Sequence, residues 1–446
     1  MDQSIAPEPE PVAGPRSGRR WLILPIVLVA FIAVAFVKPW RDGDAARVQP
    51  SPATTATVAS TPPARAVAPP PSSPTLPPAT AVITSDLPPA AIVLGSVDVG
   101  PIPWANESAA DALGVWTWAD TGAVSRVTAT TEVVTQIDLG RPSAMPGPLG
   151  SRGIAVAWSQ LWASDPAHRG LARIDRDTGA VAERIELWSA ADEEAVGGDG
   201  ATRDRWTSAW GFAVDGDSIF VPSIAARPRA AYDPARARGE LWRVDTTRDQ
   251  SPGWFPLAHP TGVAVGFGSV WVVACCGDDG DGQTTYSIVR LERETGGVQA
   301  TIPVPVPEAI VDGRPVIRIG HDAVWVGLGE VPLVLRIDPA TSSIRATVAM
   351  ELPVTDLAVD DDGTIWATES ETWYRSGAVD SDRCEGQLVR IDPTIERPVA
   401  RTTMTCPMSV AVAGNDLWVG TAGTEPGATG GMPPRLVHLR AIDPPG

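Results

Sequence analysis

The sequence is poor in several residue types that carry common chemistries. It has 446 residues but only four histidines, four cysteines and a single lysine, Lys38. Its 35 basic residues stand against 53 acidic ones, and a formal net charge of −18 argues against binding to nucleic acid. The spacings HExxH, HxxxH and GxSxG do not occur. We therefore expect no nucleic-acid partner, no metal and no cofactor.

Long hydrophobic runs are equally scarce, because the sequence has one, the 17 uncharged residues 21–37. Three arginines lie within 16–20, just before it. The run is close to the minimum length of a membrane-spanning helix. Residues 38–41 (KPWR) stand where cleavage of a signal peptide would need small residues. We predict a cytoplasmic tail at 1–20 and an uncleaved transmembrane helix at 21–37 in the lipid bilayer; a cleaved signal peptide is the alternative.

Residues 38–90 form a segment rich in Pro, Ala, Ser and Thr. Such a composition cannot bury a core and favours an extended, disordered linker. The arginines before the apolar run favour a cytoplasmic N-terminus. We therefore expect a single-pass protein of the cell membrane that carries the rest of the chain on the extracytoplasmic side.

A repeat occupies the remainder of the sequence. Its first half is a short apolar strand, a turn, and an aliphatic residue followed by an aromatic one. The copies are IAVAWSQLWA (154–163), FAVDGDSIFV (212–221), VAVGFGSVWV (263–272), IRIGHDAVWV (317–326), LAVDDDGTIWA (357–367) and VAVAGNDLWV (410–419). Its second half pairs an aliphatic–Arg–aliphatic–acid strand with another alternating strand, as in VLRIDPATSSIRATVAM (334–350). Each unit therefore predicts four short antiparallel strands.

The aromatic positions fix the number of units. They are Trp116, Trp162, Phe220, Trp271, Trp325, Trp366 and Trp418, spaced roughly 40 to 60 residues apart, which is typical of propeller blades. The last unit ends before a fourth strand, whereas 91–99 reads as a strand without earlier partners. We predict an all-β fold, a seven-bladed β-propeller over 91–446, with 91–99 closing the last blade.

Two recurring residues are expected to be structural. The aromatic residues should pack between neighbouring blades. The matching arginines should hydrogen-bond the next blade. They are Arg126, Arg173, Arg243, Arg290, Arg336 and Arg390, with His438 in the seventh place.

The aliphatic-Trp pattern followed by R-I-D-P-x-T resembles the YVTN/NHL-like propeller family, which includes virginiamycin B lyase-like proteins. The resemblance covers about 91–446 and implies the fold rather than an activity. The lyase-like relatives need a catalytic histidine and acids at the channel mouth. We expect His168 and His259 near that face and His321 in an opposite hairpin, and the family's active residues do not map onto matching positions.

Function should lie where the repeat is broken. The long departures share one face, formed by the second-to-third loops and the blade-to-blade connections. They are 192–206, 222–240, 274–286 and 369–386. The candidate binding residues there are Tyr232, Trp373, Tyr374, His259 and His168, and no residue is assigned a catalytic role.

We therefore predict a non-enzymatic binding module, with a protein, a peptide or a cell-wall glycan as the partner of the long-loop face. The first alternative is a lyase-like or lactonase-like enzyme acting at the channel mouth. The second alternative is a structural spacer.

The cysteines bear on the compartment. Cys384 and Cys406 are expected in neighbouring loops of one face, within reach of a disulfide. Cys275 and Cys276 would then remain together, as a vicinal disulfide or as two thiols.

Overall fold

The computed structural model describes sixteen stretches of the chain. They are residues 87–99, 105–111, 114–119, 122–140, 153–157, 160–168, 170–187, 211–224, 239–247, 253–257, 260–278, 284–304, 315–329, 331–371, 384–422 and 435–442. The predicted tail, the transmembrane segment 21–37 and most of the 38–90 linker lie outside them. Within the described stretches, no helix is long and apolar enough to cross a bilayer.

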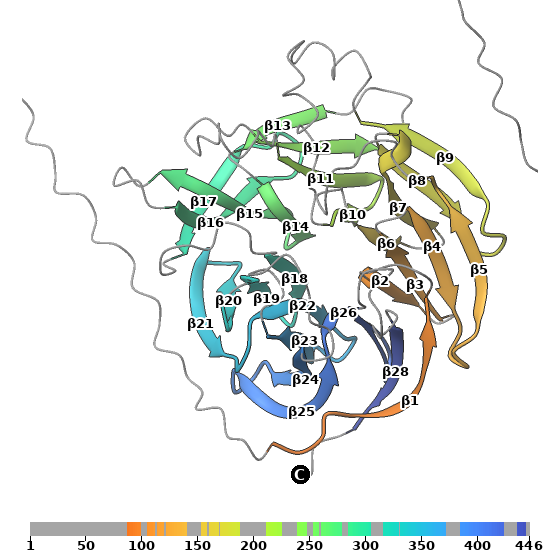
Figure 1. Cartoon of the computed structure of the whole chain (residues 1–446). Coiled ribbons are helices and arrows are strands. Elements are labelled where there is room, and N and C mark those ends of the chain that lie inside the picture. Colours follow the sequence, from red (N-terminus) through yellow and green to blue (C-terminus); the bar gives the residue numbers. More distant parts are fainter. Residues whose placement is uncertain are drawn as a thin grey trace, which may run out of the picture. The chain divides into compact units, whose positions relative to one another are not determined.

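Seven four-stranded antiparallel sheets form a ring, each sheet being one blade (Figure 1). From the innermost strand outward, blade one is β2 (Ala105–Asp111), β3 (Gly114–Ala119), β4 (Ala123–Val127) and β5 (Val133–Asp138). Blade two is β6 (Ile154–Ala157), β7 (Gln160–Asp165), β8 (Gly170–Asp175) and β9 (Val181–Glu186), with the 3-10 turn η1 (Pro166–His168) after β7. Blade three is β10 (Ala213–Asp215), β11 (Ser218–Ile224), β12 (Gly239–Asp245) and β13 (Gly253–Leu257).

The remaining blades continue the same order. Blade four is β14 (Pro260–Gly266), β15 (Ser269–Asp278), β16 (Thr284–Glu292) and β17 (Val298–Val304). Blade five is β18 (Val316–Gly320), β19 (Ala323–Gly327), β20 (Leu333–Asp338) and β21 (Ser343–Ala349). Blade six is β22 (Val354–Val359), β23 (Ile365–Ser370), β24 (Glu385–Asp392) and β25 (Arg397–Thr405). Blade seven is β26 (Pro407–Ala413), β27 (Asp416–Thr421), β28 (Arg435–Ala441) and, outermost, β1 (Ala91–Asp98). The predicted seven-bladed propeller is therefore the observed fold.

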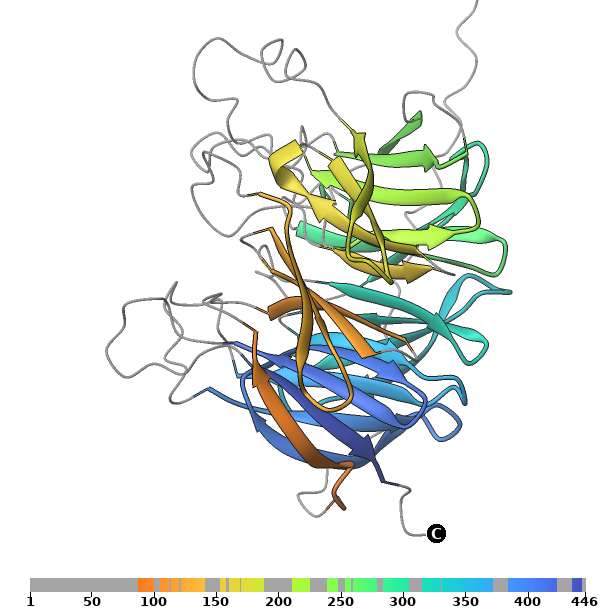
Figure 2. The same cartoon turned by 90° about the vertical axis from the view of Figure 1, so that its right-hand side faces the viewer.

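Strand β1 joins the two ends of the propeller sequence. It pairs antiparallel with β28, from Ala91 opposite Ala441 to Asp98 opposite Arg435. Figure 1 and Figure 2 both show β1, in orange, along the outside of β28, in dark blue. Since β28 is thereby covered, the last blade has the four strands of the others.

We call the segment 88–98, which contains β1, the latch. It begins earlier in the chain than the sequence predicted. The Arg401 N–H on β25 donates to the Pro88 carbonyl at 2.9 Å, and the Ala90 N–H donates to the Arg401 carbonyl at 3.1 Å. Contacts with blade six therefore begin at Pro88, inside the stretch assigned to the 38–90 linker. The physical reason is that Ala90 is fully buried beside β25. Residues 88–90 have the same Pro- and Ala-rich composition as the linker before them, so composition does not mark where the contact begins.

The hairpins between third and fourth strands follow the turn chemistry of their acids. Asp338 Oδ1 accepts the Ala340 N–H at 2.7 Å, and Asp392 Oδ1 accepts the Thr394 N–H at 2.7 Å. These bonds stabilise the ionised carboxylate, so the backbone N–H of Ala340 holds the pKa of Asp338 below its ordinary value. The acid of the repeated R-I-D-P-x-T motif therefore stabilises the turn between the third and fourth strands.

The core of the described residues includes seven clusters between blades, each containing one anchor aromatic, and a small eighth cluster around Cys406 without one. Trp325 of blade five packs with Val354 and Leu357 of blade six. Trp418 of blade seven packs with Val115 of blade one, which closes the circle. The predicted packing of the aromatics between blades is confirmed, since each of the seven lies in such a cluster.

The recurring arginines connect the same blades by polar contacts. The Arg290 guanidinium lies 5.1 Å from the centre of the Trp271 ring and donates to the Pro339 carbonyl in the next blade at 2.7 Å. The guanidiniums of Arg126, Arg243, Arg336 and Arg390 likewise donate to main-chain carbonyls of the following blade. The predicted role therefore holds for these five.

Two positions depart from the pattern. Arg173 pairs with Glu183 of its own blade at 2.9 Å. In blade seven His438 stacks on Trp418, with ring centres 4.1 Å apart, and its Nε2 lies 3.2 Å from Asp416 Oδ1. Blade seven, which the latch completes, therefore has a histidine where the blades on either side have an arginine that reaches the next blade.

The latch yields a test of closure. A chain beginning at Leu87 should fold, whereas one beginning at Pro101 should melt at lower temperature and aggregate. It loses the β1–β28 ladder and the contacts to β25, on the order of 5 kcal/mol at about 1 kcal/mol per hydrogen bond. Differential scanning calorimetry of the two chains gives the comparison. Equal melting temperatures would show that 87–99 is dispensable.

Candidate functional site

The two ends of the propeller differ in their connections. The inner hairpins and the third-to-fourth-strand turns lie at one end and are short, as between β18 and β19 or between β20 and β21. The other end carries the remaining connections, including 139–153, 187–212, 225–238, 305–315, 371–384 and 422–434. We call this end the long-connection face. All of the insertions that interrupt the repeat therefore open onto one side of the ring.

One predicted insertion is shorter than expected. The sequence 274–286 was assigned to a loop, but β15 continues to Asp278 and β16 begins at Thr284. The ladder absorbs the irregular CCG sequence as a bulge between Ala274 and Gly277. The extra residues mainly lengthen a hairpin of blade four.

Most of the predicted binding residues lie outside the described stretches. This holds for Tyr232, His259, Trp373 and Tyr374, whose placement stays a prediction. The side chains of Cys275 and Cys276 are likewise outside the described set.

His168 is described and belongs to a small polar cluster on the long-connection face. Its Nδ1 lies 2.8 Å from Asp165 Oδ1, and the Arg184 Nε–H donates to Asp165 Oδ2 at 2.8 Å. Asp165 is fully buried, whereas the His168 side chain is 51% exposed. The buried carboxylate fixes the ring by its Nδ1 side, so Nε2 is the nitrogen available to a ligand or a proton.

Cys384 and Cys406 form a disulfide at the same face, with Cα atoms 5.1 Å apart. The Cys406 N–H also donates to the Cys384 carbonyl at 3.1 Å. Cys384 directly precedes β24 and Cys406 separates β25 from β26. The bond therefore joins the second-to-third-strand connection of blade six to the start of blade seven.

The disulfide predicts the redox state of the isolated protein. Non-reducing peptide mapping of the protein purified from its native cells should recover a linked Cys384–Cys406 peptide, because such bonds persist in oxidising compartments. Reduction before digestion is the control and should separate the two peptides. Recovery of both as free thiols would contradict both the bond and the extracytoplasmic placement.

A buried carboxyl lies beside this disulfide. Glu369 at the end of β23 is 1% exposed, and its Oε2 accepts the N–H groups of Glu351 and Leu352, both at 3.1 Å. Its Oε1 accepts from Gln387, which also donates to Glu351 Oε2 at 3.0 Å. Burial raises the pKa of Glu369 from its ordinary 4.5 to about 7, more than the hydrogen bonds lower it.

This carboxyl should make stability depend on pH. Its pKa is higher in the folded protein than in the unfolded chain, so folding is favoured below about pH 4.5 and loses that contribution as pH rises to about 7. The loss is at most about 3 kcal/mol. The melting temperature of wild type should fall from pH 5 to pH 7.5, and E369Q should flatten the curve.

A second titrating group and one control variant bear on this measurement. Burial and Asp362 raise the pKa of Asp360 to about 6, so this group adds a dependence of the same sign that E369Q leaves in place. The matched control is E385Q, which removes an exposed carboxyl at the start of β24. A profile for E369Q as steep as that of E385Q would refute the assignment.

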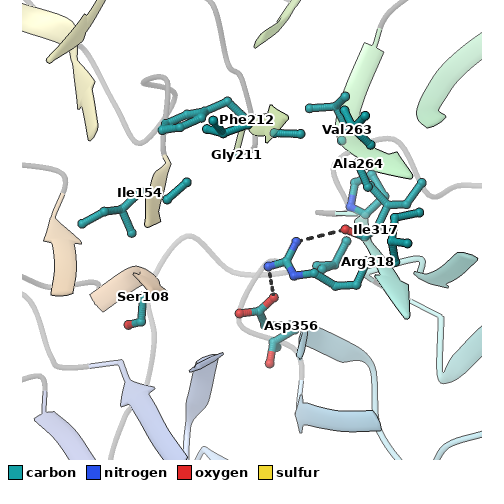
Figure 3. Close-up of a pocket in the computed structure, with 18 of the residues that line it drawn as sticks. Ser108, Ile154, Gly211, Phe212, Val263, Ala264, Ile317, Arg318 and Asp356 are labelled. Atoms are coloured by element: carbon teal, nitrogen blue, oxygen red, sulfur yellow. Dashed lines mark hydrogen bonds and ion pairs between the residues drawn. The ribbon is translucent and has the colours of Figure 1, made fainter. Parts of the chain in front are cut away.

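The centre of the long-connection face holds a cavity of about 300 Å³ (Figure 3). It lies between the inner strands and includes Phe212 and Pro315, which directly precede β10 and β18. Apolar side chains, including Ile154, Phe212 and Val263, form part of its wall, and polar atoms form slightly more of its surface than apolar ones. The volume is at the lower end for small-molecule sites, so it admits a small group.

Two charged residues, Arg318 and Asp356, belong to the lining of this cavity. The Arg318 Nη2–H donates to Asp356 Oδ1 at 2.8 Å, and the Arg318 Nη1–H donates to the Ile317 carbonyl at 3.1 Å. Figure 3 shows the guanidinium reaching from β18 into the opening, with Asp356 beside it. Asp356 is 5% exposed and also accepts the N–H groups of Leu357 and Val410. Its carboxylate is thus fixed by blades five, six and seven.

Arg318 breaks a pattern that the strand pairing makes visible. In every blade one inner-strand residue pairs with the anchor aromatic. It is Ala109, Ala155, Ala213, Ala264, Ala358 and Ala411 in six blades and Arg318 in blade five. The sequence analysis missed this site because it sought breaks in loop length. The signal was present, since IRIG stands where the other repeat copies have alanine in second place.

No protein-family model matches the chain, and no curated protein sequence matches it. Solved structures are similar to it at low identity. Streptogramin B lyase shares 12% identity, with 78% of this chain and 97% of that chain covered and a TM-score of 0.49. BamB from Moraxella catarrhalis shares 12% identity over 78% of this chain and 99% of that chain, with a TM-score of 0.44.

A chain from a mitotic checkpoint complex structure also shares 12% identity, over 83% of this chain and 97% of that chain, with a TM-score of 0.49. These likenesses are too distant to assign an activity. The seven-bladed propeller stands on the strand pairing of the chain itself.

Proposed function

We propose that the protein is a non-enzymatic binding module, held at the extracytoplasmic side of the cell membrane by residues 21–37. Its long-connection face receives a protein, a peptide or a cell-wall glycan. The observation that carries this proposal is the difference between the two ends of the ring. Short turns join the strands at one end, whereas the other end carries the long connections and the described cavity. Irregular loops on a rigid scaffold are a common arrangement for recognition.

The placement rests on the sequence and is supported by one bond. The apolar run at 21–37 follows an arginine cluster, as in a helix with a cytoplasmic N-terminus. The Cys384–Cys406 disulfide fits an oxidising compartment.

The described cavity favours binding over catalysis. Arg318 and Asp356 are the ionisable residues among its described lining, and hydrogen bonds from three groups occupy Asp356. A general base needs an accessible lone pair, which an arginine lacks and which the hydrogen bonds to Asp356 already occupy.

A lyase-like or lactonase-like enzyme is the second candidate, and the His168–Asp165 pair is the observation that favours it. The pair has the geometry of a base and its orienting carboxylate. His168 is not part of the described cavity lining, so a substrate would have to bind elsewhere on the face. Lactone hydrolysis lost in H168Q would establish this candidate.

Site-specific photo-crosslinking on intact cells tests the binding module. A photoreactive residue at position 168 stands on the long-connection face, and one at Phe267 stands on a hairpin of the opposite end. Both positions are exposed, with 51% of the His168 side chain and 40% of Phe267 accessible. We expect a discrete crosslinked partner from position 168 and at least fivefold less from position 267. Capture from 267 alone, or from neither position, would contradict the proposal and favour the spacer.

A further inference from the structure

We propose that Arg318 is a receptor for a carboxylate carried on a small apolar body, bound in the central cavity of the long-connection face. The inference deepens the binding function proposed above and rests on it for the identity of the natural partner. Its basis is a cavity-lining side chain that breaks an otherwise uniform set of alanines opposite the anchor aromatics.

The first step concerns the donors that Arg318 has left. A guanidinium carries five N–H groups in a planar fork. Asp356 and the Ile317 carbonyl take one each, and the side chain is 37% exposed. At least part of the fork therefore remains free for a second acceptor, and a carboxylate matches its geometry.

The second step concerns orientation. Asp356 is held by the N–H groups of Leu357 at 2.8 Å and Val410 at 3.0 Å. These donors offset part of its negative charge, so the Arg318–Asp356 pair still attracts an anion. The buried carboxylate also fixes the guanidinium in place before a ligand arrives, which lowers the entropy lost on binding.

The third step concerns the rest of the ligand. Ile154 and Phe212 lie across the opening from Arg318, and Val263 adds a further apolar wall (Figure 3). Ser108 is a further polar residue of the lining, and Figure 3 shows it on the side of the opening opposite Arg318. The cavity of about 300 Å³ therefore suits one aliphatic group next to the carboxylate.

The same chemistry has two sources. It is found in a free aliphatic acid and in the last residue of a peptide that ends in Leu or Ile. Both present a carboxylate within a few bonds of a branched alkyl group. They differ in whether further chain lies outside the cavity, so the assay must use both.

A purely structural role is the competing explanation for Arg318. An inter-blade ion pair alone would make R318M less stable and would confer no affinity for acids. It would also be indifferent to whether a probe carries a carboxylate or an amide. Binding selectivity therefore separates the two roles where a melting temperature cannot.

Isothermal titration of the full-length protein provides the test. The probes are 4-methylpentanoate with 4-methylpentanamide, and Ala-Ala-Leu with a free or an amidated C-terminus. We expect at least one free acid to bind tenfold or more tightly than its amide. Binding of the small acid points to a free metabolite, and binding of the peptide alone points to a chain end. Equal binding of acids and amides, or no binding of either acid, would overturn the proposal.

Variants complete the design. R318M should weaken binding of the acid at least tenfold and R318K less, because lysine keeps the charge without the fork. The matched control is R345M, which removes an exposed arginine on β21 outside the cavity. If R318M fails to fold, A155L serves instead, since it fills the cavity and leaves Arg318 and Asp356 in place. Wild-type affinity in a folded R318M or A155L would refute the site.

The two proposals fail separately. If a partner crosslinked at position 168 is retained in full by R318M, the module stands and the carboxylate site is wrong. If wild type binds the acids but no partner is captured at the surface, the site stands and the partner-binding role is wrong.

Discussion

One contact between neighbouring blades recurs in five of the seven blades of the propeller. A tryptophan on the second strand supports the guanidinium of an arginine on the third, and that guanidinium donates to a main-chain carbonyl of the next blade. The stacking contributes about 0.5–2 kcal/mol and the hydrogen bond about 1 kcal/mol. In these five cases the following blade supplies the acceptor that the arginine needs. The contact stabilises a blade only when a neighbour is present, so the ring is more stable than its parts.

The same dependence explains the construction of blade seven. Arg390 donates to the Ile442 carbonyl at 3.0 Å, just after the strand that β1 covers. The Ile442 N–H in turn donates to the Ala90 carbonyl at 3.0 Å. Ala90, just before β1, and Ile442, just after β28, are therefore joined at the carbonyl group that accepts the hydrogen bond from Arg390 of blade six. His438 stacks in this blade where the others place arginine.

Much of this fold could be predicted from the sequence, because its determinants are local and repeated. Alternating strands and a recurring tryptophan occur in nearly every copy, and turns with an acid followed by a threonine occur in several, so errors in one copy are corrected by the others. The site was harder, since it depends on a single departure. Arg318 and Asp356 are charged residues within short apolar strands, and only strand pairing shows that six alanines correspond to Arg318. The loop residues Tyr232 and Trp373 were chosen by composition, which does not determine position.

The alanine pattern also has a consequence for symmetry. A ring of seven similar blades offers a partner seven nearly equivalent rotational settings about its axis. Arg318 and Asp356 remove that equivalence, because blades five and six alone place a charged pair in the described cavity. A partner that contacts this pair is bound in one rotational setting about the axis. A single ion pair close to the axis of the propeller can thereby orient the contacts that a partner makes farther from the axis.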